Sequence, residues 1–403
     1  MKNPFEGVKV FGNTYAGTGN FVLRTLGMHG ATCVRIESKL KPCNLRVSGP
    51  FYENKQGINR SAWYSLYNND RFSLALNLKH TKAPKVLKRL VEWADIFVEN
   101  FTPGAMGRLG LDYETISKIN PRIIMLSISL QGQTGPHRLL SGYGSLLQGL
   151  TGHDYLTGWA DKGPVLIDQS YPDFIAPAFA STALIAALHQ RRQTGKGQYI
   201  DLSNYECSIH WLSPAILDYT VNNRVQMRRG NRVDYAAPHG VFRCKGDDTW
   251  CAIAVHTDSE WTSFCSILGN PSWTREPRFS TFLGRKEHQD EMEKFIESWS
   301  INYSAGEIMT KMQEAGISAG KVQTCEDVVN NPQIKYRNFF PTADNAEVGT
   351  YDTYALSYKL SKTPSEIQYP FPLLGEHTEY VCRELLGMPE EEFVDMLLDG
   401  AFE

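Results

Sequence analysis

Two aspartates, Asp168 and Asp173, lie five positions apart in the stretch GPVLIDQSYPDFIAPAFAS (residues 163–181), at the head of a long apolar run. Asp173 follows a proline, and an aspartate in that place is typical of a residue that caps the start of a helix. A helix N-terminus also favours the ionised form of a carboxylate, which is the form a nucleophile needs. The two roles are compatible, so the residues alone leave both open.

The short motifs of other chemistries are missing or incomplete. GTGNFV (17–22) follows an expected strand and precedes an expected helix, with Glu37 twenty residues after Gly17, so it imitates the dinucleotide motif GxGxxG. Val22 replaces the third glycine, and a tight turn into a helix is expected instead of a NAD or FAD site. No GxSxG, HExxH or GxxxxGK[ST] motif occurs. The catalytic group is therefore expected among ordinary polar residues.

Composition excludes several classes of protein. The 403 residues carry 41 Lys plus Arg against 44 Asp plus Glu, a net charge of -3 without the basic surface that a nucleic-acid partner needs. The eight cysteines lie far apart with no zinc-type spacing, so we expect buried thiols, a reducing compartment and no metal. The N-terminus has no signal-like apolar region and no 18-residue apolar stretch is evident, so we expect a cytoplasmic protein with no membrane partner.

Strands and helices alternate in the first third of the chain and must position these residues. Strands are expected in VKVFGN, GMHGATCVRIE, RFSLALNL, DIFVENF and RIIMLSIS, with helices between them. This order predicts a doubly wound α/β sheet with parallel strands. The long helix FIAPAFASTALIAALHQRRQ comes next, and its apolar character predicts that it is buried.

The pattern of expected strands and helices changes after this helix. We expect a large domain over 1–225, a smaller α+β domain over 226–330 with two strands around a GDD turn, and a return to the large domain over 331–403.

Four segments, in order along nearly the whole chain, resemble the family III CoA-transferases, the group typified by formyl-CoA transferase and carnitine CoA-transferase. They are GVKVFGNTYAGTGNFVLRTLGMHGATCVRIE (7–37), VENFTPGAMGRLGLDYETISKINPRII (98–124), IAALHQRRQTGKGQYIDLS (185–203) and PLLGEHTEYV (372–381). The resemblance implies a Rossmann-like large domain built from both chain ends, a smaller inserted domain and an interlocked dimer. It also implies transfer of CoA from an acyl-CoA to a carboxylic acid, with CoA as substrate and no permanently bound cofactor.

The resemblance assigns the nucleophile to Asp173, which lies sixteen residues before His189, the spacing of the family's catalytic aspartate. A carboxylate suits this reaction because a mixed anhydride and an aspartyl-CoA thioester both preserve the reactivity of a thioester. Tyr143 in SGYGS matches an active-site tyrosine; the alternative is an aromatic residue at a strand end. Related acyl-CoA racemases carry a catalytic histidine in that position, so a racemase or isomerase is the weaker alternative.

Nine further residues match positions that contact CoA in the family. An arginine suits a phosphate and a phenyl ring suits adenine or pantetheine, although an ordinary loop with an exposed arginine is the alternative. The nine residues are Tyr15, Ala16, Arg35, Lys39, Leu74, Lys79, Asn100, Phe101 and Arg108.

The chain also departs from the family pattern. Gly17 stands where formyl-CoA transferase has a catalytic glutamine, and RRGNRVDYAAPHG (228–240) replaces its glycine-rich lid, so oxalate and formate are poor substrate candidates. Five aromatic residues in or near the site segments suggest a bulky or aromatic acid, as in the branch that acts on benzylsuccinate: Trp159, Tyr171, Phe174, Trp211 and Tyr235. A homodimer and a heteromer with a homologous subunit are both open.

Overall fold

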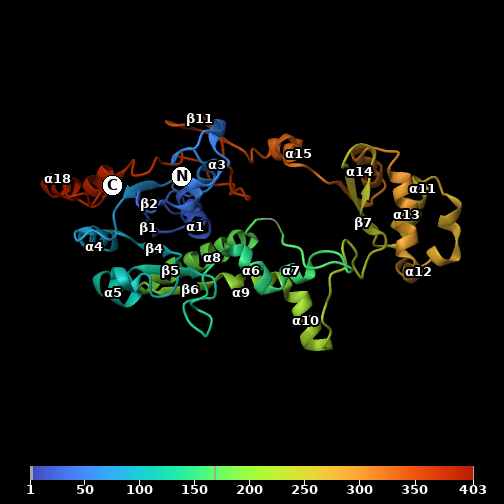
Figure 1. Cartoon of the computed structure of the whole chain (residues 1–403), viewed down its shortest axis with the longest axis horizontal. Coiled ribbons are helices and arrows are strands. Elements are labelled where there is room, and N and C mark those ends of the chain that lie inside the picture. Colours follow the sequence, from blue (N-terminus) through green and yellow to red (C-terminus); the bar gives the residue numbers. More distant parts are fainter. Residues whose placement is uncertain (1–2, 168, 403) are drawn as a thin grey trace. The chain divides into compact units, whose positions relative to one another are not determined.

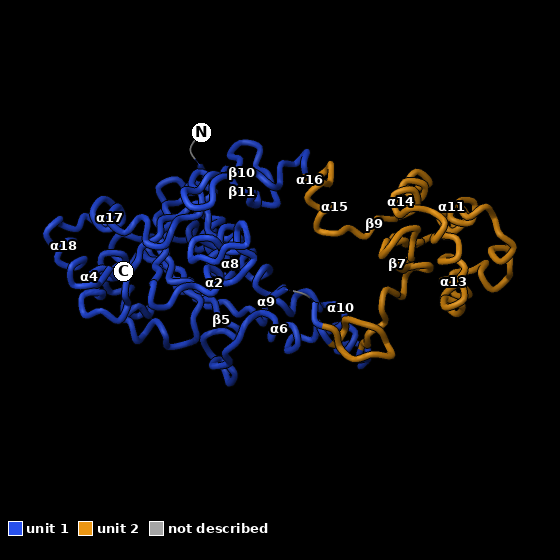
Figure 2. The backbone as a smooth tube through the Cα atoms, turned by 45° about the horizontal axis from the view of Figure 1, so that its top comes forward, with its two compact units in different colours: residues 1–154, 166–225, 335–403 blue, residues 155–165, 226–334 orange. Residues whose placement is uncertain are grey.

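The computed structural model describes residues 3–167 and 169–402, so Asp168 lies outside the described residues. The chain forms two compact units (Figure 2), the first made of residues 1–154, 166–225 and 335–403 and the second of residues 155–165 and 226–334. The longer segment of the second unit, residues 226–334, overlaps the small domain expected over 226–330. The unit also contains residues 155–165, which the sequence analysis placed in the large domain.

A six-stranded parallel sheet forms the centre of the first unit, with the strand order β3-β2-β1-β4-β5-β6 (Figure 1). This is the order of doubly wound nucleotide-binding sheets, and it reverses between β1 and β4, so a crevice opens at the carboxyl ends of those two strands. Five of these strands were expected, and β6 was not. The strands are β1 (Lys9–Asn13), β2 (Thr32–Glu37), β3 (Phe72–Ala75), β4 (Ile96–Glu99), β5 (Ile124–Ser129) and β6 (Tyr199–Ser203).

Successive side chains of the strands point to opposite faces of the sheet and build two cores. Phe11 and Val34 lie in the core that α4, α5 and the C-terminal α18 cover, whereas Val10 and Cys33 lie in the core under α1 and α8. The C-terminal segment therefore completes the first unit, which also holds the hairpin β10 (Thr342–Asn345) and β11 (Gly349–Asp352). The principal helices of this unit are α1 (Thr18–Gly27), α3 (Ala62–Tyr67), α4 (Ala83–Trp93), α5 (Tyr113–Ile119), α6 (Gly144–Thr151), α8 (Tyr171–Thr194), α9 (Asn204–Ile209), α10 (Ser213–Asn222) and α18 (Glu390–Leu398).

The long helix α8 is buried on one face only. Ala180 and Leu184 pack in the core against the sheet, but Phe174 and Ile185 are 44% and 53% exposed. The expected burial therefore holds for one face of the helix and not for the other. Among the described residues, α8 is also the one helix long and apolar enough to cross a membrane, contrary to the expectation of no such stretch. Its packing against the sheet is that of a core helix.

The second unit is a small α+β body with its own core. Its antiparallel sheet consists of β7 (His239–Arg243), β8 (Trp250–Ala254) and β9 (Ser318–Lys321), and the expected GDD turn joins the first two strands. Trp261, Phe264 and Phe279 are among the buried aromatic residues of its core. Its helices include α11 (Asp258–Ile267), α12 (Phe282–Glu287), α13 (Gln289–Ser300), α14 (Ala305–Glu314) and α15 (Cys325–Asn330).

Candidate active site

Asp173 lies in the first turn of α8 but does not cap the helix. The N-cap is Ser170, which makes no capping hydrogen bond through its side chain. The carboxylate of Asp173 turns instead toward the loop after β1 and the start of α9. Its Oδ1 accepts hydrogen bonds from Thr18 Oγ1 at 2.9 Å and from Asn204 Nδ2 at 3.4 Å. The capping interpretation of this side chain is wrong.

The environment of this carboxylate acts on its pKa in two directions. Burial raises the pKa of Asp173, while the Thr18 hydroxyl and the backbone N–H of Gly144 lower it, and the net direction is upward. A poorly hydrated carboxylate with a raised pKa is a stronger nucleophile than an exposed one, and the donors favour its ionised form. These two donors stabilise the charged form of Asp173, as the sequence analysis expected of the helix N-terminus. Their effect on the pKa is smaller than the opposite effect of burial.

A hollow of about 260 Å³ opens beside Asp173. Tyr143 lies on its rim, 54% exposed, as the N-cap residue of α6 and not at the end of a strand. The structure thus brings the two predicted catalytic residues to one hollow. Its other lining residues are Tyr15, Ala16, Thr18, Lys41, Asn100, Phe101, Thr102, Ile128, Ser129, Leu130, Leu140, Ser141, Gly142 and Asn204.

A larger hollow of about 540 Å³ adjoins the first, and the two share Tyr15, Lys41 and Phe101 among their lining residues. It lies at the carboxyl ends of β1, β2, β3 and β4, where ligands of doubly wound sheets bind. Three exposed cations line it: Lys41, Lys79 and Arg108. The pair of hollows therefore joins a buried carboxylate to a positively charged rim.

Comparison with known proteins agrees with this arrangement. Residues 5–378 match the sequence profile of CoA-transferase family III. The chain belongs to CoA-transferase family III. It is 29% identical to succinyl-CoA–D-citramalate CoA-transferase of Chloroflexus aurantiacus over 96% of each chain. It is 30% identical to the beta subunit of succinyl-CoA–L-malate CoA-transferase from the same organism, over 98% of this chain and 96% of the relative.

The solved structures show the same fold. A CaiB/BaiF family protein from Brucella suis superposes with a TM-score of 0.87 at 27% sequence identity, covering 96% of this chain and 100% of that one. The chain is therefore an enzyme, a family III CoA-transferase, and its substrates include a CoA thioester.

Arg35 of this CoA-transferase lies beneath the larger hollow and is 1% exposed. Its guanidinium pairs with Glu37 at 3.1 Å and donates to Asn68 Oδ1 at 3.0 Å and to the Thr14 carbonyl at 3.1 Å. Burial raises the pKa of Glu37, but Arg35 and Arg46 outweigh it and hold that pKa well below its usual range. Arg35 thus supports the loop after β1 and also lines the larger hollow, and its predicted contact with CoA stays a prediction.

Leu74 and Lys39 also lie away from both hollows. Leu74 is fully buried inside β3, and it is Leu76 and Leu78, beyond the carboxyl end of that strand, that line the larger hollow. Lys39 lines a separate hollow beside Gly375, in the LLGEHT segment. Lys41, which the sequence analysis missed, takes the expected place of Lys39. The segment between Glu37 and α2 (Asn44–Val47) is irregular, so no periodicity indicated which lysine faces the crevice.

Asn100 positions the first loop as well as lining the smaller hollow. Its Oδ1 accepts from the backbone N–H of Tyr15 at 2.7 Å, and its Nδ2 donates to the Tyr15 carbonyl at 2.6 Å. This amide therefore joins the loops that follow β1 and β4. Of the remaining predicted residues, Ala16 and Phe101 line the smaller hollow, and Lys79, Phe101 and Arg108 line the larger one.

Sequence reasoning missed three polar residues beside Asp173: Thr18, Ser129 and Asn204. Each lies at or just beyond the carboxyl end of a parallel strand or its following loop, which is where such sheets place ligand contacts. That rule could have found Thr18 and Ser129. Asn204 was beyond reach because β6 was not expected.

A histidine, His153, lies ten positions after Tyr143, the position where the related racemases carry their catalytic histidine. His153 Nδ1 lies 2.8 Å from Thr151 Oγ1, and the histidine ring packs edge-on against Tyr171 at 6.1 Å. His153 is not among the described residues that line the hollow at Asp173. Among the described residues, no histidine lines the hollow that holds Asp173 and Tyr143.

None of the five aromatic residues expected near the substrate lines the hollow at Asp173. Phe174 packs against Phe21 at 5.4 Å and Tyr171 against Trp211 at 5.9 Å, whereas Trp159 and Tyr235 belong to the second unit. Packing against neighbouring rings accounts for Phe174, Tyr171 and Trp211, and the aromatic acceptor stays a prediction.

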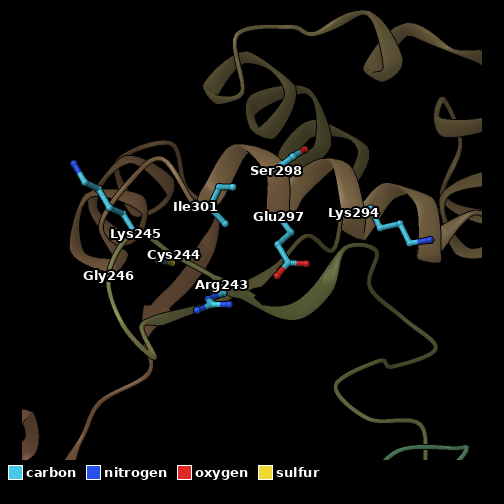
Figure 3. A pocket seen from close by; sticks show the side chains of 8 residues that line it. All are labelled: Arg243, Cys244, Lys245, Gly246, Lys294, Glu297, Ser298 and Ile301. Carbon is cyan, nitrogen blue, oxygen red and sulfur yellow. The ribbon is translucent and has the colours of Figure 1, made fainter.

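The second unit has a hollow of its own, of about 580 Å³, lined by Arg243, Lys245, Lys294 and Glu297 among others. Figure 3 shows the ammonium groups of Lys245 and Lys294 pointing away from each other on either side of Glu297. Because these cations do not converge, this hollow offers no built anion site.

Cysteine and metal chemistry find little support in the described part of the chain. Seven of the eight cysteines are buried and Cys325 is exposed, and burial raises the pKa of Cys33 to about 12. No group of three or more His, Cys, Asp or Glu side chains in residues 3–167 and 169–402 could hold a metal ion.

Proposed function

We propose that this CoA-transferase moves CoA from an acyl-CoA to a carboxylic acid through covalent intermediates on Asp173. One observation carries the proposal: the hollow that holds this half-buried carboxylate adjoins a larger one rimmed by Lys41, Lys79 and Arg108. In this proposal CoA lies across the two hollows. Its phosphates would meet Lys79 and Arg108, its pantetheine arm would pass Phe101, and its thioester would reach Asp173.

The proposed chemistry conserves the thioester bond energy in four steps. A carboxylate oxygen of Asp173 bonds to the donor carbonyl carbon as the C–S bond breaks, which gives an anhydride and CoA thiolate. The thiolate attacks the aspartyl carbonyl carbon and releases the donor acid. The acceptor carboxylate then displaces the thiolate to form a second anhydride, and the thiolate finally takes the acceptor acyl group and restores Asp173. Water must be excluded throughout, because it would hydrolyse each intermediate.

We propose short dicarboxylic acids as donor and acceptor. The two relatives named above act, by their names, on succinyl-CoA with citramalate or malate. The hollow at Asp173 has hydroxyl and amide groups from Thr18, Ser129 and Asn204 along its wall. Lys41 is the one cation among its described lining residues and suits the distal carboxylate of such an acid.

A panel of donors and acceptors tests this function. Incubating the enzyme with succinyl-CoA and individual acids should give new CoA thioesters with dicarboxylates of roughly four to six carbons at least tenfold faster than with aromatic monocarboxylates, since each unpaired polar group costs binding energy. Mass spectrometry of the CoA esters is the measurement. Faster transfer to benzylsuccinate-type acids would restore the aromatic interpretation. Deuterium uptake at the α-carbon of an acyl-CoA without any acceptor would favour the racemase alternative.

We further propose that the chain acts as an interlocked dimer, with a second copy or a homologous subunit. The support is a number of exposed apolar side chains on two helices of the first unit: Phe174, Phe179 and Ile185 of α8, and Leu217, Tyr219 and Val221 of α10. Large apolar side chains gathered in exposed positions are typical of interfaces in soluble proteins. One relative is itself named a beta subunit, so a heteromer is open.

Sedimentation of the purified chain is expected to show a dimer that does not dissociate on dilution, because interlocked subunits cannot separate without unfolding. A folded and active monomer at assay concentration would exclude the interlocked arrangement.

A further inference from the structure

The two oxygens of the Asp173 carboxylate have different surroundings. Both side-chain hydrogen bonds that the described part of the chain makes to it, from Thr18 Oγ1 and Asn204 Nδ2, end on Oδ1. Oδ2 faces Gly144, where a Cβ atom would lie only 2.9 Å from it. The backbone N–H of Gly144 also lowers the pKa of this carboxyl group, and the missing side chain of the glycine leaves room at Oδ2. Side-chain donors therefore hold the carboxylate at Oδ1, and in the described part of the chain none of them bonds Oδ2.

Both donors are rigidly placed. Thr18 and Asn204 are each 4% exposed, Thr18 at the start of α1 and Asn204 at the start of α9. Thr18 follows strand β1 and Asn204 follows strand β6, so two separate strands of the sheet position the two donors. Asn204 Oδ1 and Ser129 Oγ are buried polar atoms without a hydrogen-bond partner in the described structure. Such atoms at the wall of a hollow indicate a place where a polar ligand binds.

We propose that Thr18 and Asn204 form an oxyanion hole for the steps at the aspartyl carbonyl carbon, so that Oδ1 stays on the enzyme and Oδ2 is the oxygen that reacts. This inference rests on the proposed role of Asp173 as nucleophile. In the second and third steps, a thiolate or a carboxylate adds to the aspartyl carbon, and the electron pair of its C=O bond moves onto the retained oxygen. Donors already aimed at that oxygen stabilise the charge without reorganising.

The fate of each oxygen follows from this assignment. Oδ2 bonds to the donor acyl carbon in the first step and leaves with the donor acid in the second, when the bond between the aspartyl carbon and Oδ2 breaks. One oxygen of the acceptor carboxylate takes its place in the third step. It stays on Asp173 when the CoA thiolate removes the acceptor acyl group in the fourth. Each turnover thus replaces one carboxylate oxygen of Asp173 and never the other.

Heavy-oxygen labelling tests the assignment directly. The intact enzyme is turned over many times with succinyl-CoA and an acceptor acid carrying ¹⁸O in both carboxylate oxygens, and the peptide containing SYPDFIAP is then weighed by mass spectrometry. Asp173 should retain a single heavy oxygen however many turnovers occur. Two heavy oxygens would overturn the assignment, because they would show that Oδ1 also exchanges. No heavy oxygen at all would instead refute the proposed covalent role of Asp173.

Substitution of Thr18 provides the second test. Thr18→Val removes the hydroxyl and keeps the side-chain shape, and kcat is expected to fall about 10²-fold, the usual effect of losing one oxyanion donor. In this variant the Asp173 peptide should also gain a second heavy oxygen, because the carboxylate group can then rotate between catalytic cycles. Thr18→Ser, which keeps the hydroxyl, should restore most of the rate and the single label.

The matched control is Thr25→Val on the same helix, where the lost hydroxyl bonds only to the Phe21 carbonyl. It should leave both rate and labelling unchanged. A Thr18→Val enzyme with the rate and labelling of Thr25→Val would show that Thr18 has a structural role only and would overturn the proposal.

Discussion

Asp173→Asn is expected to reduce the rate of CoA transfer by roughly 10³-fold or more, while the protein remains folded. An amide cannot form the anhydride, yet asparagine has nearly the shape of aspartate and can still accept from Thr18, which now bonds Oδ1 at 2.9 Å. The measurement is transfer from succinyl-CoA under saturating acceptor, with thermal unfolding recorded on the same sample.

The covalent adduct provides the complementary measurement. Wild-type enzyme incubated with a donor acyl-CoA should carry a labile group on the peptide containing SYPDFIAP, which hydroxylamine converts to a hydroxamate. Asp168→Asn, five positions earlier and outside the described residues, is the control and should stay within about tenfold of wild type. Normal transfer by Asp173→Asn, or an adduct that maps to Asp168, would remove the chemical role of Asp173.

Gly144→Ala is expected to reduce transfer by about 10²-fold or more, the effect of displacing a reacting group by an ångström. A Cβ atom at this position would lie 2.9 Å from both Cγ and Oδ2 of Asp173 and 2.9 Å from Ser170 Cβ. The carboxylate would have to leave Thr18 and Asn204 to make room. Alanine itself suits a helix better than glycine, so the loss of rate should exceed any loss of stability.

Gly149→Ala, in the same helix α6, is the matched control. A Cβ atom there would come no closer than 3.4 Å to Asp154 Oδ2, so transfer should change little. Steady-state kinetics and thermal unfolding of both variants separate the two effects. If Gly144→Ala loses no more activity than Gly149→Ala, the lack of a side chain at position 144 is not needed to place the Asp173 carboxylate. The assignment of Oδ2 as the reacting oxygen would then lose its structural support.

Local patterns predicted the core of the fold because they follow from side-chain periodicity. Five strands of the parallel sheet are rich in apolar residues, as strands covered on both faces generally are. The edge strand β6, YIDLS, is exposed at Tyr199 and Asp201 and lacks such a run, so its pattern was not recognised. The apolar character of α8 predicted burial, but Phe174 and Ile185 are exposed. Composition shows that a helix is apolar and does not show what covers each face.

The sequence by itself determined the family and the alternation of strands and helices, because these depend on the order and spacing of residues along the chain, and the family resemblance singled out Asp173 and Tyr143 as candidates. Only the tertiary structure decided that Thr18, 155 positions from Asp173, and Asn204, 31 positions away, meet one oxygen of its carboxylate. It also decided that Arg35 is paired with Glu37 beneath the larger hollow, whereas Lys41 faces it. Such partners depend on which strands lie side by side. Strand order is set by packing over the whole unit, and no local period in the chain encodes it.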